Sequence, residues 1–226
     1  LLHTAPSIRD ALATLLPRVE RVIAIVLAPH YSPFIMGGYG TALAAAATEL
    51  GATIPVTIAD PWYEIPGWID SLSERLAHTI AEAGSLPVVF TAHSMPEVVV
   101  KRDPGYIDQI HETIRLVAAR TGLRDDQWQF GYQSAGHAPE EWLSPDFKDL
   151  VPDIAAAGHS GVIFAPVQFL SDHLETLYDI DVAGREEAEE VGLDFHRVPM
   201  PNLSPTFIDA LRQVVEREVA AAGDRG

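Results

Sequence analysis

Histidine side chains follow three apolar segments of this sequence. They are His30, His93 and His173, and each sits in a polar cluster directly after the apolar run. If these runs are parallel strands, the clusters lie at the carboxyl edge of a sheet, where open α/β sheets bind ligands. Histidine exchanges protons near neutral pH and ligates transition metals. The pattern therefore indicates acid–base or metal chemistry at a sheet edge.

An acidic segment follows the last of these apolar runs. Glu175 lies two residues after His173, and Asp179 lies four residues after Glu175. On a helix the two carboxylates would share a face, which is costly unless a cation is bound between them. A solvated helix N-terminus, where the macrodipole favours acids, explains the same residues without any ligand. The spacing alone leaves both interpretations open.

His93 differs from most other histidines because it follows a fully apolar run and precedes the helix-breaking pair Met95-Pro96. Its position places it at a carboxyl sheet edge but does not by itself decide between a functional and a structural role. The histidines that lie within expected helices, a turn or an edge strand are interpreted as structural: His78, His111, His159 and His196.

Composition excludes several classes of function. The chain has 226 residues, 47% of them hydrophobic, and no cysteine, so a disulfide framework, a cysteine-ligated zinc site and a cysteine-ligated iron–sulfur cluster are excluded. A net charge of −17 argues against nucleic acid as a partner. No apolar run reaches the about 18 residues of a membrane span and no signal peptide is visible, so we expect a cytoplasmic protein.

The chain alternates between apolar runs and helical patterns. This alternation is typical of right-handed βαβ units and predicts an α/β fold with parallel sheets. A glycine-rich loop at residues 37–40 is expected to lead into a helix at 41–50, without the spacing of a phosphate-binding motif. Strands are expected at residues 21–27, 54–59, 86–92, 128–132, 161–169 and 194–198.

Aromatic side chains concentrate at the expected strand ends and loops, among them Tyr31, Tyr39, Trp62 and Trp142. Ordinary packing explains them, and so does a flat hydrophobic ligand held between two lobes. The sequence contains no nucleophile elbow, no HExxH motif and no EF-hand loop, so hydrolase and standard zinc or calcium sites lack support.

Four segments together resemble the ferrochelatase family of class II chelatases. They read LAPHYSPFIMGGYG, FTAHSMPEVVVKRDPGYIDQIHET, FGYQSAGHAPEEWLSPD and PVQFLSDHLETLYDID, in that order. The third segment is most similar to the bacterial coproporphyrin III branch. The resemblance implies an enzyme that inserts ferrous iron, its substrate metal, into a porphyrin in haem biosynthesis. A non-catalytic porphyrin- or haem-binding protein and a cobalt chelatase acting on a related tetrapyrrole are the alternatives.

The resemblance also implies roles for single residues. His93 matches the family's histidine at the metal-insertion face, and Glu175 matches the glutamate opposite it, so both are expected to be catalytic and to contact the metal. Asp179 continues the family's acidic metal path. Tyr39, Tyr132 and Ser134 are expected to contact the porphyrin.

The family's architecture implies two Rossmann-like lobes with parallel sheets flanked by helices. We expect residues 1–123 to form the N-terminal lobe, with its last helix able to cross over, and residues 124–226 to form the C-terminal lobe. An N-terminal segment of the family is absent, so the first lobe is expected to be incomplete. An upstream segment or a partner chain would then complete the pocket.

Overall fold

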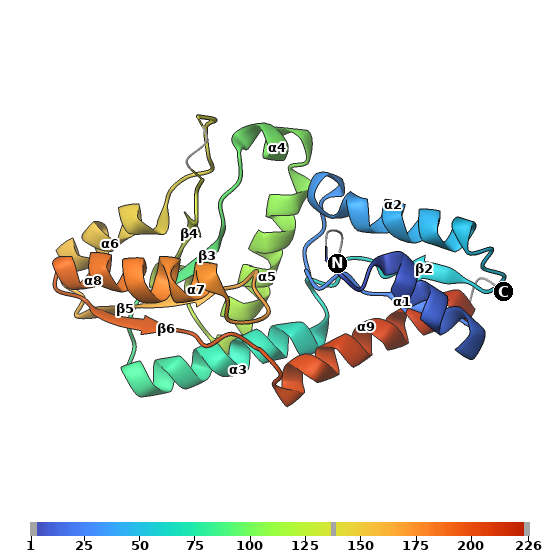
Figure 1. Cartoon of the computed structure of the whole chain (residues 1–226). Helices are drawn as coiled ribbons and strands as arrows, with labels where there is room; N and C mark the ends of the chain where they lie inside the picture. The colour runs from blue at the N-terminus through green and yellow to red at the C-terminus, as the bar shows by residue number, and fades with distance from the viewer. Residues whose placement is uncertain (1–3, 137–138, 224–226) are drawn as a thin grey trace.

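Two parallel sheets form the framework of the part of the chain that the computed structural model describes, residues 4–136 and 139–223 (Figure 1). The first sheet pairs β1 (Val22–Ala24) with β2 (Val56–Ile58). The second has the order β4-β3-β5-β6, with β3 at Val88–His93, β4 at Trp128–Gln133, β5 at Gly161–Pro166 and β6 at Asp194–Arg197. All pairings are parallel, which confirms the predicted α/β fold.

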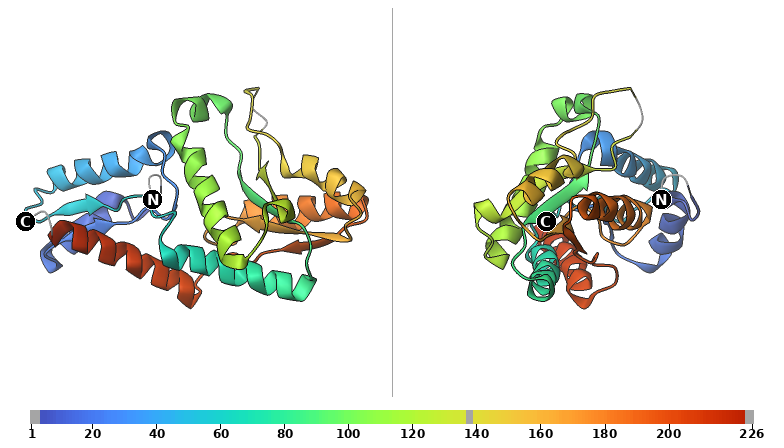
Figure 2. Two further views of the ribbon diagram at one scale, coloured as in Figure 1. Left: turned by 180° about the vertical axis from the view of Figure 1, so that it is seen from behind. Right: turned by 90° about the vertical axis from the view of Figure 1, so that its left-hand side faces the viewer.

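Helices connect the strands and cover both faces of the larger sheet (Figures 1 and 2). Their bounds are α1 Ile8–Leu15, α2 Pro33–Glu49, α3 Pro66–Ala83, α4 Glu97–Arg102, α5 Gly105–Thr121, α6 Phe147–Ala156, α7 Leu174–Leu177, α8 Arg185–Glu190 and α9 Pro205–Gly223. A π-helix, η3 (Asp179–Gly184), lies between α7 and α8, and short 3-10 turns occupy Leu16–Arg18 and Asp125–Gln127.

The core lies on the two faces of strands β3 and β5, which are central in the larger sheet. All six residues of β5 are buried, because helices cover both of its faces. One core cluster packs Phe90 and Ile163 against α3, α5 and α9, and a second packs Val89 and Phe164 against α6 and α8. A strand covered on both faces has no polar alternation, so it reads as a continuous apolar run.

The glycine-rich segment at residues 37–40 is helical, so the prediction of a loop there is wrong. Helix α2 begins at Pro33 rather than at residue 41. Ser32 caps it by accepting a hydrogen bond from the Phe34 N–H at 3.3 Å, and Pro33 occupies a position where its missing N–H costs nothing. This strong start signal outweighs the low helix propensity of the three glycines.

The sheets divide the chain differently from the predicted boundary at residue 123. Strand β3 pairs with β4 and β5, so residues 88–93 belong to the second sheet. Helix α9, near the end of the chain, passes beneath the smaller sheet (Figure 2). Arg217 on α9 donates hydrogen bonds to the carbonyls of Asp60 and Pro61, just beyond β2. The order of the elements along the sequence predicts neither the pairing of β3 within the second sheet nor the return of α9 to the smaller sheet.

Among the described residues, no helix has both the length and the apolar character needed to cross a membrane.

Candidate functional site

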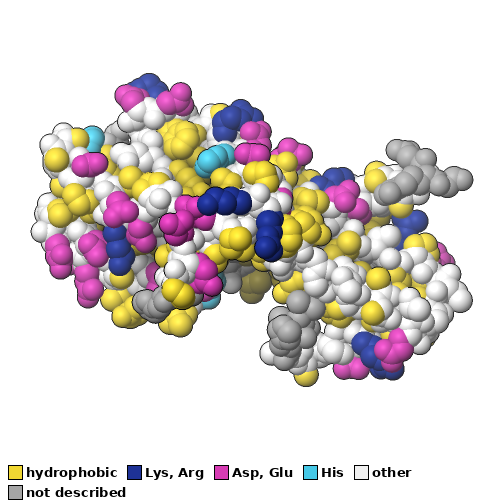
Figure 3. Space-filling view, turned by 90° about the horizontal axis from the view of Figure 1, so that it is seen from above, with side chains coloured by type: hydrophobic (Ala, Val, Ile, Leu, Met, Phe, Trp, Pro, Cys, Tyr) yellow, Lys and Arg dark blue, Asp and Glu magenta, His cyan; other side chains and the backbone are white. Residues whose placement is uncertain are grey.

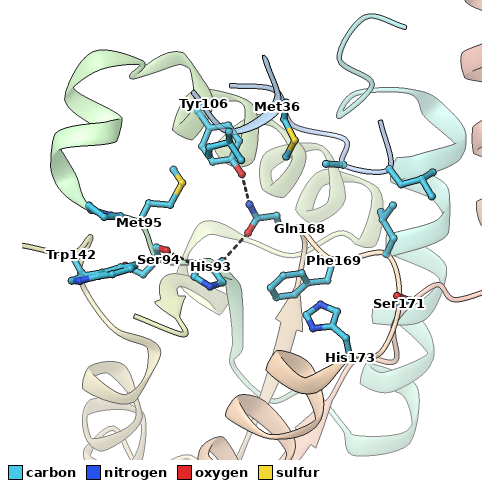
Figure 4. Close-up of a pocket in the computed structure, with 15 residues that line it drawn as sticks. Met36, His93, Ser94, Met95, Tyr106, Trp142, Gln168, Phe169, Ser171 and His173 are labelled. Atoms are coloured by element: carbon cyan, nitrogen blue, oxygen red, sulfur yellow. Dashed lines mark hydrogen bonds between the residues drawn. The ribbon is translucent and has the colours of Figure 1, made fainter. Parts of the chain in front are cut away.

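A cavity of about 570 Å³ opens where β3 and β5 end and the segment after β1 approaches them (Figure 4). Its walls are mainly apolar, and a few polar groups converge on it, which is typical of small-molecule sites. The lining residues are Leu27, Ala28, Ile35, Met36, His93, Ser94, Met95, Pro96, Tyr106, Trp142, Gln168, Phe169, Leu170, Ser171 and His173.

His93, the last residue of β3, is held at both its backbone and its ring. Its N–H donates to Gln168 Oε1 at 2.8 Å, and its Nδ1 lies 2.5 Å from the Ser94 carbonyl oxygen (Figure 4). A carbonyl oxygen only accepts, so this contact places the proton on Nδ1. In the neutral ring the lone pair is therefore on Nε2, the nitrogen that can take a proton or bind a metal.

Glu175 stands opposite that nitrogen, with its Oε1 3.7 Å from His93 Nε2. The capping of α7 sets its position, because the Glu175 N–H donates to His173 Nδ1 at 3.2 Å. The two side chains are 31% and 43% exposed, so both can be reached from solvent. The structure brings together His93 and Glu175, the two residues that the resemblance paired.

Asp179 and Ser134 are joined behind Glu175. The Ser134 hydroxyl donates to Asp179 Oδ2. Ser134 has a φ of 60°, the left-handed region that a side chain seldom occupies, and Asp179 begins the π-helix. Both features are uncommon and often mark functional sites.

Two neighbouring acids are neutralised instead of facing the cavity. Arg197 makes ion pairs with Asp181 at 2.5 Å and with Asp172 at 3.0 Å, and its side chain is only 13% exposed. This triad fixes the π-helix against β6 and the loop after β5. Asp172 and Asp181 thus differ from Glu175 and Asp179, because Arg197 neutralises both of them.

The two predicted tyrosine contacts occupy other places. Tyr39 lines a second cavity of about 560 Å³, which shares Leu27, Ala28 and Met36 with the first. Tyr132 on β4 is 6% exposed and packs edge-on against Phe130, and it does not line the first cavity. Burial raises the pKa of its phenol.

The sequence reasoning missed Gln168 and Tyr106. Gln168 accepts from His93 and donates to the Tyr106 hydroxyl (Figure 4). Tyr106 is 2% exposed, and burial raises its pKa to about 12, so it remains a neutral phenol. Gln168 is the first polar residue after the buried run of β5, the one sequence signal that could have found it.

His30, the first of the three histidines, is buried instead of facing a ligand. It is 1% exposed, and its Nε2 lies 3.0 Å from Thr113 Oγ1. Because Thr113 donates its own proton to the Tyr63 carbonyl, His30 Nε2 carries a proton. Burial lowers the pKa of His30 to about 3. His30 therefore joins the segment after β1 to α5 as a neutral ring.

Within the described part of the chain, no three histidine or acidic side chains are grouped closely enough to hold a metal ion. Among these residues His93 and Glu175 offer a metal two potential ligands, with no third grouped beside them. Hydrophobic side chains reach the surface near the middle of the molecule in Figure 3. The exposed hydrophobic side chains include Leu27, 66% exposed, and Phe34, 55% exposed.

Comparisons with known proteins identify the family of this chain. The family model described as Ferrochelatase matches residues 1–219. The chain belongs to the ferrochelatase family. A ferrochelatase of Deinococcus radiodurans is 39% identical over 224 residues, which are 96% of this chain and 71% of that protein. A coproporphyrin III ferrochelatase of Geobacillus thermodenitrificans is 38% identical, covering 99% of this chain and 72% of the relative.

Two solved structures share the fold of this chain. SirB from Bacillus subtilis with Fe³⁺ aligns with a TM-score of 0.66 at 12% identity, covering 98% of this chain and 80% of that one. The sirohydrochlorin chelatase SirB from Bacillus subtilis subspecies spizizenii in complex with cobalt aligns with a TM-score of 0.59, also at 12% identity, covering 94% and 76%. At this identity the likeness concerns the fold alone.

Proposed function

We propose that this chain inserts ferrous iron into a porphyrin, and that the porphyrin is coproporphyrin III. One observation carries the proposal: the His93 Nε2 lone pair faces Glu175 at 3.7 Å beside an apolar cavity of about 570 Å³. Membership in the ferrochelatase family supports the reaction, and the relatives named coproporphyrin III ferrochelatase support the substrate.

Metal insertion replaces two pyrrole N–H protons with one divalent cation, so the products are the metalloporphyrin and two protons. His93 Nε2 is placed to accept a pyrrole proton, because its Nδ1 proton is already engaged by Ser94. The Glu175 carboxylate can pass the cation to the macrocycle or take the second proton. Imidazole and carboxylate are suitable ligands for ferrous iron, and two of them alone hold it loosely.

The apolar walls suit a flat aromatic macrocycle. Ile35, Met36 and Met95 present apolar surface, and the Trp142 side chain offers an aromatic wall. A macrocycle that extended past Met36 would reach the adjoining cavity and Tyr39. Tyr132 would act from behind the cavity wall. Ser134 would act through Asp179, which we propose as the next carboxylate along the path of the metal.

Optical titration under anaerobic conditions tests the proposal. Coproporphyrin III is added to the protein first and ferrous iron second, with protoporphyrin IX and cobalt as comparison substrates. The proposal expects iron coproporphyrin to form above the protein-free rate and faster than iron protoporphyrin. A spectral shift on porphyrin addition without metal insertion would instead identify a porphyrin-binding protein. Faster insertion of cobalt would identify a cobalt chelatase.

The free edge of the smaller sheet is the place where further chain would complete the first lobe. Among the described strands β1 and β2 pair only with each other, so each has a free edge. The β1 edge is favoured because Val22, Ile23 and Ala24 of β1 line a cavity. We propose that an upstream segment or a partner chain pairs with this edge, because open edges favour strand addition. Adding a peptide with the sequence of the corresponding segment of a relative should raise the porphyrin affinity if the edge is the docking site.

A further inference from the structure

We infer that Gln168 is a positioning residue for His93 and that Tyr106 orients it; the inference rests on the proposed iron insertion. Neither residue carries a role from the sequence motifs. Both line the cavity, and together they connect helix α5 to the end of strand β3 (Figure 4).

The hydrogen-bond ladder between β3 and β5 stops short of His93. The pairing runs to Thr91 opposite Pro166, and the Val167 N–H still donates to the Thr91 carbonyl at 3.0 Å. In a regular parallel ladder the His93 N–H would next meet the Val167 carbonyl. It meets Gln168 Oε1 instead, at 2.8 Å. The Gln168 side chain therefore takes the place of the strand where β5 turns away from β3 and the cavity opens.

On the other edge of β3 the ladder with β4 continues through His93. The Ser94 N–H donates to the Gln133 carbonyl of β4 at 2.7 Å. The end of β3 is thus held by backbone on one side and by a single side chain on the other. Loss of that side chain would leave the His93 N–H without its acceptor at the residue that presents the reactive imidazole.

The Gln168 amide is held in one direction by its two partners. The His93 N–H can only donate, so the oxygen of the amide must face it and the NH₂ group must face Tyr106. The Tyr106 oxygen accepts that bond. Tyr106 is held in turn on α5, which also binds the segment after β1: Gln109 exchanges two hydrogen bonds with the Tyr31 backbone, at 2.8 and 2.9 Å. The orientation of Gln168 is therefore set by the helix that joins both walls of the cavity.

Three variants separate the parts of this arrangement. Gln168→Leu removes both hydrogen bonds at similar side-chain length. Gln168→Glu keeps an acceptor for the His93 N–H, and the Tyr106 hydroxyl can turn and donate to its second oxygen. Tyr106→Phe removes only the Tyr106 oxygen. Ser71→Ala is the matched control, since Ser71 is a buried residue whose side chain accepts from Arg75 at 2.9 Å, outside the cavity lining.

Steady-state iron insertion is the first measurement. A misplaced imidazole stabilises the transition state less but leaves porphyrin binding almost unchanged. Gln168→Leu should therefore lower kcat about 10-fold with little change in the porphyrin KM. Gln168→Glu should restore most of the lost kcat, and Tyr106→Phe should fall between Gln168→Leu and the parent protein. A kcat for Gln168→Leu equal to that of Ser71→Ala would overturn the positioning role.

The ¹⁵N spectrum of the His93 ring in the metal-free protein is the second measurement, and it does not depend on turnover. The parent protein and Gln168→Glu should show the single tautomer with the proton on Nδ1, whereas Gln168→Leu should show averaging of the two tautomers. An unchanged His93 signal in Gln168→Leu would overturn the inference even if the parent protein inserts iron. A changed signal would support it even if the proposed reaction fails.

Discussion

His93 Nε2 and Glu175 Oε1 lie 3.7 Å apart, one at the end of a strand and the other in the first turn of a helix. The ring nitrogen that faces the carboxylate is the one without a proton in the neutral tautomer. Two acceptors that face each other favour a proton or a cation between them. This relationship defines the first prediction.

Substitution of either partner should suppress iron insertion. His93→Ala removes the proton acceptor, and Glu175→Gln removes the charge that draws the cation, so each should lower kcat by at least about 100-fold, the usual scale for the loss of acid–base help. The control is the pair His78 and Glu82, which is 3.3 Å apart and exposed on α3. His78→Ala should leave turnover unchanged. Near-normal turnover in both site variants would remove His93 and Glu175 from the mechanism.

The hydrogen bond from Ser134 should hold the Asp179 carboxylate in position for ferrous iron. Ser134→Ala and Ser134→Gly both remove the hydroxyl, and each should raise the KM for ferrous iron up to about ten-fold, the equivalent of about 1.4 kcal/mol for one hydrogen bond to a charged group. The two variants differ in backbone strain, because φ at position 134 is 60°. Ser134→Gly should therefore be more stable than Ser134→Ala by about 1 kcal/mol in chemical unfolding.

Equal shifts in iron KM with unequal stability would assign the effect to the hydroxyl. An unchanged iron KM in both variants would show that the contact between Ser134 and Asp179 takes no part in the delivery of the metal.

The sequence located the two central strands of the site, for a physical reason. Strands β3 and β5 are buried on both faces and therefore stand out as unbroken apolar runs, so the polar residues that follow them, including His93, could be placed at a carboxyl edge. The pairing of His93 with Glu175 came from the resemblance, and spacing alone left Glu175 open.

The remaining features depend on tertiary structure. The expected strand at residues 161–169 ends at Pro166, and only its divergence from β3 turns Gln168 into a hydrogen-bond acceptor. Tyr106 lies on a different helix, so no local pattern joins it to Gln168. The membership of β3 in the second sheet and the return of α9 to the first lobe are likewise long-range pairings.

His30 should make the protein less stable in acid. Burial lowers its folded-state pKa to about 3, whereas the unfolded chain binds the proton near pH 6.5. The unfolded state therefore binds more protons between these two values, so the contribution of His30 is complete above about pH 6.5 and is lost as the pH falls toward 3. At pH 5 the expected loss is about 2 kcal/mol relative to pH 7.5.

His30→Gln isolates this effect, because the glutamine amide can still donate to Thr113 but does not titrate. The free energy of unfolding, measured with urea at both pH values, should fall by about 2 kcal/mol less in His30→Gln than in the parent protein. Ser71→Ala, which changes no titratable group, is the control and should lose as much stability between the two pH values as the parent protein does. Equal losses in the parent protein and in His30→Gln would contradict the assignment.

The absence of a side chain at Gly136 should leave the space that the Trp142 indole needs to line the cavity. A Cβ atom at this position would lie 2.5 Å from Cζ2 of Trp142, so Gly136→Ala must displace the indole that lines the cavity. Loss of about 1 kcal/mol of apolar contact would raise the Kd for porphyrin about five-fold, with kcat at saturating substrate nearly unchanged. Gly223→Ala, where a Cβ meets nothing within 4 Å, is the matched control. Fluorescence titration with coproporphyrin III measures both variants, and equal affinities would show that the Trp142 indole is not a wall of the porphyrin site.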